Sequence, residues 1–191
     1  MNKQNCRFWR WENPRAIHQR ELHPIKCTVW CGVTSERIIG PYFFVNEDGS
    51  ATTVTSERYR AMLNNFVRPT LKDKPEMWFQ QDAATAHVAH ATMKLLRQIF
   101  GHRIISRNSE ISWPSRSPDL TPPDYFLWGY LKERVSINKP HTIQQLKDNI
   151  CAEIWGLQPE LLFAVMENAI ERARLCEAEN GGHLSCIIFN K

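Results

Sequence analysis

The stretch "MWFQQDAATAHVAHATMKLL", Met77 to Leu96, changes from one periodicity to another at a single acid. Apolar and aromatic residues predict a buried strand over 77–82, and apolar residues at helical spacing predict a helix over 86–100. An acid at the end of a buried strand, such as Asp82, is costly unless a helix N-terminus, a basic side chain or a metal ion compensates its charge. This stretch alone leaves two interpretations open, a helix cap or a functional acid at the carboxyl edge of a sheet.

The rest of the chain predicts antiparallel strands first, then strand–helix–strand alternation, and then a helical C-terminal end. This order favours an α/β fold in which one mixed sheet is flanked by helices, built as a single domain over residues 1–191. The other predicted elements are strands at 5–11, 26–34, 37–45 and 102–106, helices at 57–71 (capped by Ser56), 124–135, 142–157 and 159–178, and a strand-like run in the C-terminal tail after Gly181.

Composition limits the classes of protein that the chain can represent. Its 191 residues are 42% hydrophobic and 23% charged, which is typical of a globular domain with a real core. No apolar run approaches the roughly 18 residues of a membrane span, so we expect no membrane partner. A net charge of +4 permits nucleic acid as a partner without requiring it. The cysteines lack zinc-ligand spacing, and Cys27 and Cys31 are expected to be buried thiols on one face of a strand, in an intracellular protein.

A second motif, "SPDLTPPDYFLWGYLK" from Ser117 to Lys132, begins with a proline-rich loop and continues into a predicted helix. Thr121 suits the N-cap, Pro122 suits the first helical position, and Asp124 falls in the first turn, where the helix dipole favours an acid by about 0.3–1 kcal/mol. Asp119 fits an acid in a turn that precedes a loop of prolines. A rigid loop that delivers an acid to a helix start, beside a strand acid, also suits metal coordination. Spacing alone does not decide between these interpretations.

Together, "WFQQDAATAHVAHATMKLL" and "WPSRSPDLTPPDYFLWGYLK" resemble the catalytic core of mariner-like DNA transposases, members of the Tc/mariner superfamily. Those enzymes carry a "QQDxAxxH" strand end and an "SPDLxPxDYxLW" loop and helix. The resemblance extends to "NKQNCRFW", "VWCGV", "GPYFF" and the "GGHL…IIF" tail, and so covers nearly the whole chain. It implies an RNase H-like fold of the DDE/DDD type, in which three carboxylates hold two Mg²⁺ or Mn²⁺ ions for DNA strand cleavage and strand transfer.

By this resemblance, Asp82 corresponds to the second family carboxylate and Asp124 to the third, so both are expected to be catalytic metal ligands. Asp119 is expected to shape its loop without binding metal. His87 matches the family histidine after the strand and is expected to support a ligand or lie near DNA, although it also fits a helix-start histidine with no role in catalysis. The extra length between the two ligands, relative to the best-known mariner elements, lies near residues 107–116.

The first family carboxylate and the central strand precede the residues that match "NKQNCRFW", and neither Glu12 nor Glu21 matches a family ligand. We therefore expect an N-terminally truncated transposase that lacks the first catalytic strand and the helix-turn-helix region and is inactive alone. The alternatives are a catalytically dead DNA-binding remnant of a transposable element and the unfolded product of a pseudogene.

The resemblance also implies DNA partners, namely transposon ends and target DNA, a homodimer in the full-length protein, and a nuclear location. Several basic side chains could contact DNA phosphates, although each also fits an ordinary solvated charge. These are Arg97, Arg103, Arg107, Arg116, Lys132 and Arg134.

Overall fold

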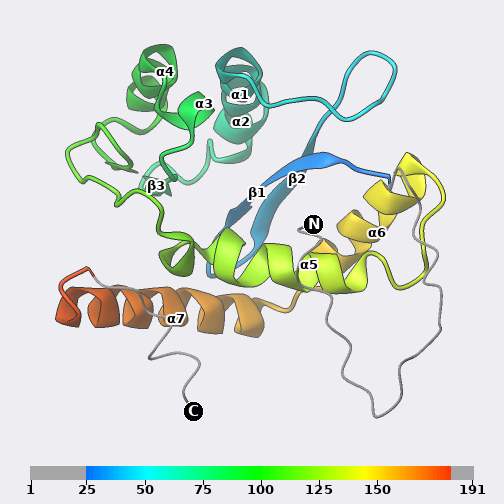
Figure 1. Ribbon diagram of the computed structural model, residues 1–191. Helices are drawn as coiled ribbons and strands as arrows, with labels where there is room; N and C mark the ends of the chain where they lie inside the picture. The colour runs from blue at the N-terminus through cyan, green and yellow to red at the C-terminus, as the bar shows by residue number, and fades with distance from the viewer. Residues whose placement is uncertain (1–24, 182–191) are drawn as a thin grey trace, which may run out of the picture.

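An antiparallel hairpin forms the middle layer of the fold, in a computed structural model that describes residues 25–181 (Figure 1). Strand β1 (Thr28–Val33) pairs with β2 (Ile38–Phe44), with Thr28 opposite Phe44 and Val33 opposite Ile38. The register shifts near Gly40, whose φ is 117° and where a Cβ atom would lie 3.0 Å from the carbonyl oxygen of Trp30. The hairpin predicted from 26–34 and 37–45 is confirmed. The strands predicted at 5–11 and in the tail after Gly181 lie outside the described residues.

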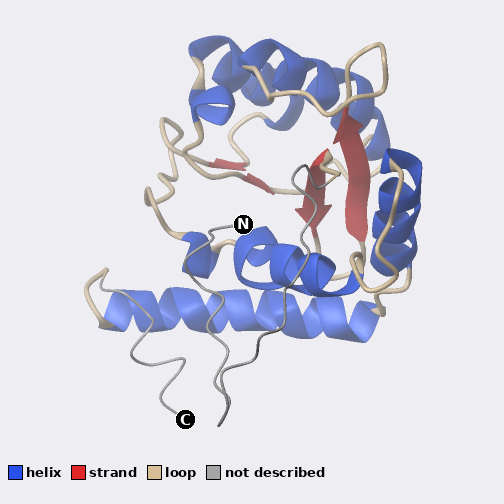
Figure 2. Ribbon diagram, turned by 45° about the vertical axis from the view of Figure 1, so that its right-hand side comes forward, coloured by secondary structure: helices blue, strands red, loops and turns tan. Residues whose placement is uncertain are grey.

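The two faces of the hairpin belong to two hydrophobic clusters, as the period of two in a strand requires. Trp30, Tyr42 and Phe44 pack into the first cluster, and Cys31 and Phe43 into the second. Figure 2 shows the hairpin between helices on either side. The first cluster lies under α1 (Ser56–Met62), η2 (Leu63–Val67) and α4 (His90–Phe100), while α2 (Arg68–Thr70) continues η2 without a buried residue. The second cluster lies under η4 (Pro123–Leu127), α5 (Trp128–Arg134), α6 (Ile143–Trp155) and α7 (Pro159–Ala178).

Cys27 and Cys31 both belong to the second cluster, as the spacing of four predicted. Both are free thiols, with Cys31 buried and Cys27 half-buried. Burial raises the pKa of the Cys31 thiol to about 12, with a smaller contribution from Cys151. A thiol with so high a pKa is a poor nucleophile and metal ligand, so it serves packing.

A short parallel pair positions the first candidate acid. Strand β3 (Phe79–Gln80) pairs with β4 (Ile104–Ile105), and the Gln81 N–H donates to the Ile105 carbonyl at 3.1 Å. The strand predicted over 77–82 is therefore real but shorter, and Asp82 follows directly after its last ladder hydrogen bond.

The helix predicted over 86–100 is wrong in one respect, because it is broken at Ala89 into α3 (Thr85–Val88) and α4. Ala89 has an extended ψ of 139°. The Gln81 amide donates to the His87 carbonyl at 3.1 Å, and Thr92 Oγ1 donates to the Ala86 carbonyl at 2.9 Å. These two carbonyl groups would otherwise accept the hydrogen bonds of a continuous helix.

Two predicted caps are also corrected. The first helix is capped by Thr55, whose side chain accepts from the Arg58 N–H, and Ser56 is its first helical residue. Thr121 does not cap its helix, because its hydroxyl donates to the Ser117 carbonyl at 3.1 Å. A single turn, η3 (Pro118–Leu120), precedes it and η4 follows it, so Asp124 still lies in the first turn of a helix.

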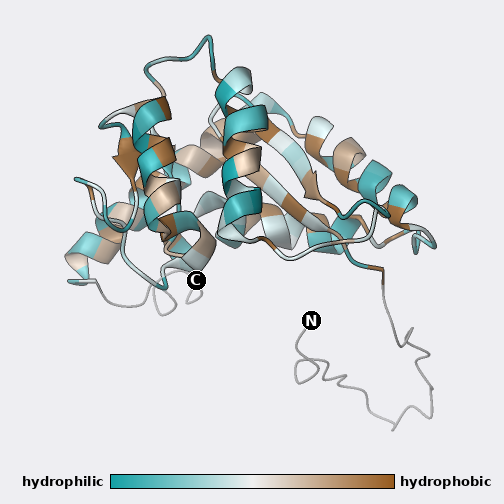
Figure 3. Ribbon diagram, turned by 90° about the horizontal axis from the view of Figure 1, so that it is seen from above, coloured by the Kyte–Doolittle hydropathy of each residue, from teal (hydrophilic) through white to brown (hydrophobic). Residues whose placement is uncertain are grey.

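The single mixed sheet that the sequence predicted is not found among residues 25–181. The described strands form two separate pairs, β1–β2 antiparallel and β3–β4 parallel. The fold is nevertheless mixed α/β with a helical C-terminal end, as predicted. The helices alternate between hydrophilic and hydrophobic residues along their length, as expected where one side is buried (Figure 3). Within the described residues, none of the helices combines the length and the apolar character of a membrane span.

Candidate metal centre

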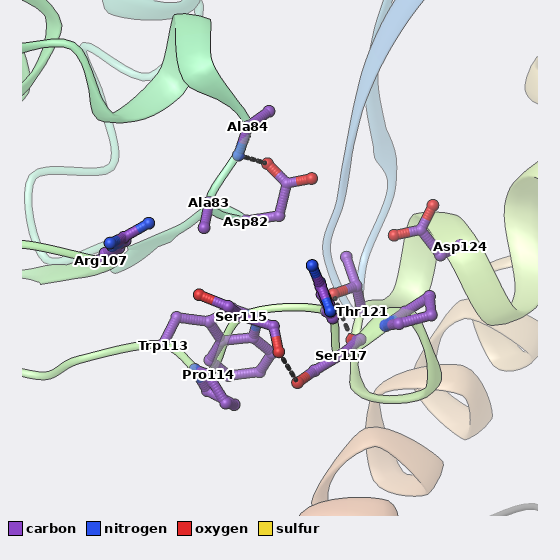
Figure 4. Close-up of a pocket in the computed structure, with 12 residues that line it drawn as sticks. Asp82, Ala83, Ala84, Arg107, Trp113, Pro114, Ser115, Ser117, Thr121 and Asp124 are labelled. Carbon is purple, nitrogen blue, oxygen red and sulfur yellow. Dashed lines mark hydrogen bonds between the residues drawn. The ribbon is translucent and has the colours of Figure 1, made fainter. Parts of the chain in front are cut away.

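A pocket of about 370 Å³ lies where the β3 end meets the proline-rich loop (Figure 4). Its wall comes from residues 82–84, from Arg107 after β4, and from the segment 113–124 that leads into η4. Asp82 and Asp124 both line it. Each comes from one of the two sequence motifs, so the fold brings the predicted acids to one site.

Asp82 is held at this pocket by contacts to one of its two carboxylate oxygens. Asp82 Oδ1 accepts from the Ala84 N–H at 3.1 Å and lies 2.5 Å from His87 Nδ1. The His87 contact, and to a smaller extent the Ala84 N–H, lower the pKa of Asp82 below its usual value against the opposing effect of burial. Among residues 25–181, no donor contacts Asp82 Oδ2. One oxygen is therefore fixed, and the other remains available to a ligand.

A buried polar network positions His87 in turn. Gln81 is 5% exposed and Tyr59 is 1% exposed, and the Tyr59 hydroxyl donates to Gln81 Oε1 at 2.9 Å. Gln81 Nε2 donates to the His87 carbonyl and to Ser106 Oγ, each at 3.1 Å. The Tyr59 and His87 rings lie 4.3 Å apart between centroids. The backbone and the ring of His87 are thus held from two sides, and His87 holds Asp82.

Asp124 is fixed by its backbone, whereas its carboxylate is free. The Asp124 N–H donates to the Thr121 carbonyl at 2.8 Å, and no donor among the described residues contacts the side chain. The pKa of Asp124 is raised, first by burial and then by the negative charge of Asp82, while Lys132 opposes the rise. The two acids are therefore near enough to repel each other. A cation between them would relieve that repulsion.

Asp119 lies apart from this arrangement. It is absent from the pocket wall, and its backbone carbonyl accepts from the Arg172 guanidinium at 3.0 Å across to α7. Arg172 also lies over the Tyr125 ring, 4.2 Å from its centroid. These contacts anchor the proline-rich loop to α7. The role in loop shape that the resemblance implied for Asp119 stays a prediction.

The donors at this pocket match a hard divalent cation. Carboxylate oxygens are the ligands that Mg²⁺ and Mn²⁺ prefer, and Mg²⁺ is commonly held by one or two carboxylates while it keeps several waters. Within residues 25–181, no cluster of three or more His, Cys, Asp or Glu side chains has a metal-binding arrangement. The described residues therefore offer two carboxylates.

Sequence reasoning missed the network behind Asp82 and part of the pocket wall. Gln81 shares the buried face of its strand with Phe79, two residues earlier. A polar residue at a buried strand position was the available signal, because such a group requires partners. Trp113 and Arg116 line the pocket from an irregular loop, where no periodicity marks which side chains point inward.

Replacing His87 with alanine should weaken Mn²⁺ binding by about 10–100-fold, the usual effect of removing a group that supports a metal ligand. The fixed orientation of Asp82 depends on the contact to His87 Nδ1. Titration of Mn²⁺ followed by electron paramagnetic resonance measures this change. The control is His90→Ala, at an exposed position on α4, which should leave the affinity unchanged. Equal effects of the two substitutions would contradict the role of His87.

Without metal, replacing Asp124 with asparagine should raise the free energy of unfolding at neutral pH. An acid whose pKa is raised by folding destabilises the folded state once it ionises. The gain should disappear as the pH falls below the ordinary carboxyl pKa of about 3.9, where both states carry the proton. Urea denaturation across this pH range measures the effect. A variant less stable than the wild type at neutral pH would contradict the cause assigned to the raised pKa.

Comparison with known proteins finds similarity to transposases in sequence and in fold. No protein-family model matches the chain. The transposable element Tc3 transposase of Caenorhabditis elegans is 27% identical over 162 residues, covering 81% of this chain and 45% of the relative. The chain thus spans less than half the length of this relative.

Two solved structures of the Mos1 transposase share the fold. The Mos1 catalytic domain, solved with raltegravir and Mg, has a TM-score of 0.69 at 20% identity and covers 82% of this chain and 76% of that one. The Mos1 strand transfer complex has a TM-score of 0.72 at 19% identity and covers 93% of this chain and 51% of that one. In its two motifs, in its curated relative and in this shared fold, the chain is similar to the Tc1/mariner-like transposases, with the likeness falling in their catalytic domain.

Proposed function

We propose that this chain carries the catalytic pocket of a DNA transposase, which cleaves DNA strands at the ends of a mobile element and joins them to target DNA. One observation carries the proposal. Asp82 and Asp124, which come from two separate motifs, line a single pocket, where Asp82 Oδ2 and the Asp124 carboxylate have no donor among residues 25–181.

In this proposal, Asp82 and Asp124 bind Mg²⁺ or Mn²⁺, and His87 orients Asp82. Mos1 catalytic domains have been solved with each of these metals, which supports the choice. When bound, a pair of such ions activates the attacking oxygen and stabilises the leaving oxygen of an in-line displacement. The protein supplies fixed carboxylates on rigid elements, and the buried contacts of Gln81 limit the movement of the segment that carries Asp82.

A complete two-ion site needs more than these two acids. We propose that the first family carboxylate comes from a central strand outside residues 25–181, which would join the β1–β2 and β3–β4 pairs into one RNase H-like sheet. The separation of the two strand pairs supports this arrangement. With Asp82 and Asp124 as its only carboxylates, the site would lack a firm anchor for the second ion, and we propose that a chain with these two acids alone is inactive.

DNA is the proposed partner, as transposon ends and as target DNA. Mos1 structures include a pre-cleavage transpososome and a strand transfer complex, and the same fold here supports a similar use. A homodimer in the full-length protein and a nuclear location remain proposals that follow from this role.

A catalytically dead DNA-binding remnant is the second candidate. The observation that favours it is the lack of a third metal-binding side chain beside Asp82 and Asp124 in the described part of the chain. The transposase and the remnant differ in what they predict for a chain to which the first family carboxylate is added, because only the transposase should then cleave DNA.

The test is DNA cleavage with Mn²⁺, using a substrate that bears the element ends. The 191-residue chain should leave the DNA intact, and a version extended at its N-terminus by an aspartate-bearing strand should cut it. Asp82→Ala in the extended version should abolish that cleavage. If the extended version binds DNA without cutting it, the remnant interpretation is correct. Cleavage by the unextended chain that depends on Asp82 would show that another residue provides the third ligand.

A further inference from the structure

Arg107 is held at the pocket by a turn of defined shape that follows β4. Ser109 Oγ accepts from the Ser106 N–H at 2.9 Å and donates to the Ser106 carbonyl at 2.8 Å. Arg97 donates to the Asn108 carbonyl at 2.8 Å, and Asn108 has a left-handed φ of 68°. The turn therefore fixes the backbone of Arg107, while the side chain stays exposed at the pocket wall.

Arg116 reaches the same pocket from the proline-rich loop, with a left-handed φ of 59°. This conformation is uncommon for arginine and persists only where the surrounding structure requires it. Pro114 and Pro118 flank it, and Ser117 Oγ donates to the Ser115 carbonyl at 3.4 Å. The loop thus fixes the backbone from which the exposed Arg116 side chain extends at the pocket wall.

Two guanidinium groups and two carboxylates thus share one pocket, yet they do not pair. Among residues 25–181, the ion pairs join Lys74 to Glu36, His87 to Asp82 and Arg174 to Glu171. Arg107 and Arg116 form none, although Asp82 and Asp124 line the same pocket. Their charges are therefore available to an anion from outside the described chain.

The two guanidinium groups favour a ligand rich in hydrogen-bond acceptors. A guanidinium presents several N–H donors in a plane that matches phosphate oxygens, and it stays charged at every relevant pH. The pocket of about 370 Å³ falls within the range of sites for small ligands, so it can hold part of a nucleic-acid strand.

We propose that Arg107 and Arg116 bind backbone phosphates of the DNA strand that crosses this pocket, beside Asp82 and Asp124. The inference rests on the proposed function and adds to it the residues that position the substrate. The carboxylates hold cations at the reacting phosphate, and the arginines hold the neighbouring phosphates directly. Phosphate contacts of this kind fix the register of a strand without reading its sequence.

The test measures the salt dependence of DNA binding, because each phosphate contact contributes about −0.9 to the slope of log K against log salt concentration. The variants are Arg107→Gln and Arg116→Asn, since asparagine tolerates the left-handed backbone at that position. The control is Arg68→Gln, an exposed arginine outside the pocket wall. Binding of a labelled duplex of about 20 base pairs is followed by fluorescence anisotropy in EDTA, from about 50 to about 200 mM salt.

Each pocket variant should make the slope shallower by about 0.9, the double variant should change it by about twice that amount, and Arg68→Gln should leave it unchanged. Unchanged slopes in the pocket variants would overturn the proposal, as would an equal change in the control. Failure of the wild-type chain to bind the duplex would overturn it as well.

Mn²⁺ binding, measured on the same proteins without DNA, separates this inference from the proposed function. The arginine variants should retain Mn²⁺ binding, because their side chains are not metal ligands. If the wild type binds Mn²⁺ but the arginine variants keep the wild-type salt slope, only the arginine inference fails. If the wild type does not bind Mn²⁺, the proposed function fails first, and the arginine assignment falls with it.

Discussion

Replacing either Asp82 or Asp124 with asparagine is expected to lower the affinity of the chain for Mn²⁺ by at least about 100-fold. Loss of a group that merely supports a metal ligand already costs about 10–100-fold, so loss of a ligand should cost no less. Asparagine keeps the size of the side chain and removes the charge that attracts the ion. Because both acids line one pocket, each single substitution should remove most of the binding. Calorimetric titration measures the loss.

Asp119→Asn is the matched control for this comparison. Asp119 belongs to the same sequence motif as Asp124 but lies outside the pocket wall, and its carbonyl accepts a hydrogen bond from Arg172. It should retain wild-type Mn²⁺ affinity. If Asp119→Asn removes the binding and Asp124→Asn does not, the wrong acid of the second motif has been assigned to the metal.

Replacing Leu127 with alanine is expected to destabilise the folded chain by about 2–5 kcal/mol, the usual range for truncating a buried leucine. Leu127 is fully buried and ends η4, the helix whose first turn carries Asp124. It packs in the cluster that also contains Cys31 from β1 and Leu131 from α5. The resulting cavity should therefore loosen the contact between the hairpin and the helix start that presents Asp124. Urea denaturation measures the change in free energy.

Ile137→Ala is the control for packing, because Ile137 is 74% exposed. Its effect should stay within about 0.5 kcal/mol, as for most surface substitutions. A loss at Leu127 no larger than the loss at Ile137 would mean that η4 is not packed as described, and the placement of Asp124 would need revision.

The elements that the sequence predicted well are those whose own pattern determines them. The hairpin follows from β-branched and aromatic residues in two runs joined by a tight turn, and its alternate residues do face opposite clusters. Helix α6 begins after Thr142, which forms a capping box with Gln145 that is visible in the sequence. For the hairpin and for α6, the residues of the element itself are sufficient to predict it.

The parts that the sequence did not predict depend on contacts between distant segments. The helix breaks at Ala89 because the buried Gln81 side chain donates a hydrogen bond to the His87 carbonyl. The division into two strand pairs depends on strand neighbours, which residue patterns do not encode. At the site, both acids could be identified from their motifs, whereas their convergence on one pocket required the fold.

The most direct measurement of a metal centre shared by Asp82 and Asp124 is the anomalous scattering of Mn²⁺ in a crystal of the chain. We expect an anomalous peak between the carboxylates of Asp82 and Asp124, within about 2.0–2.6 Å of an oxygen from each, with water completing the coordination. We expect no peak at Asp119. A peak that contacts only one of the two acids, or that lies at another part of the chain, would contradict the shared metal centre.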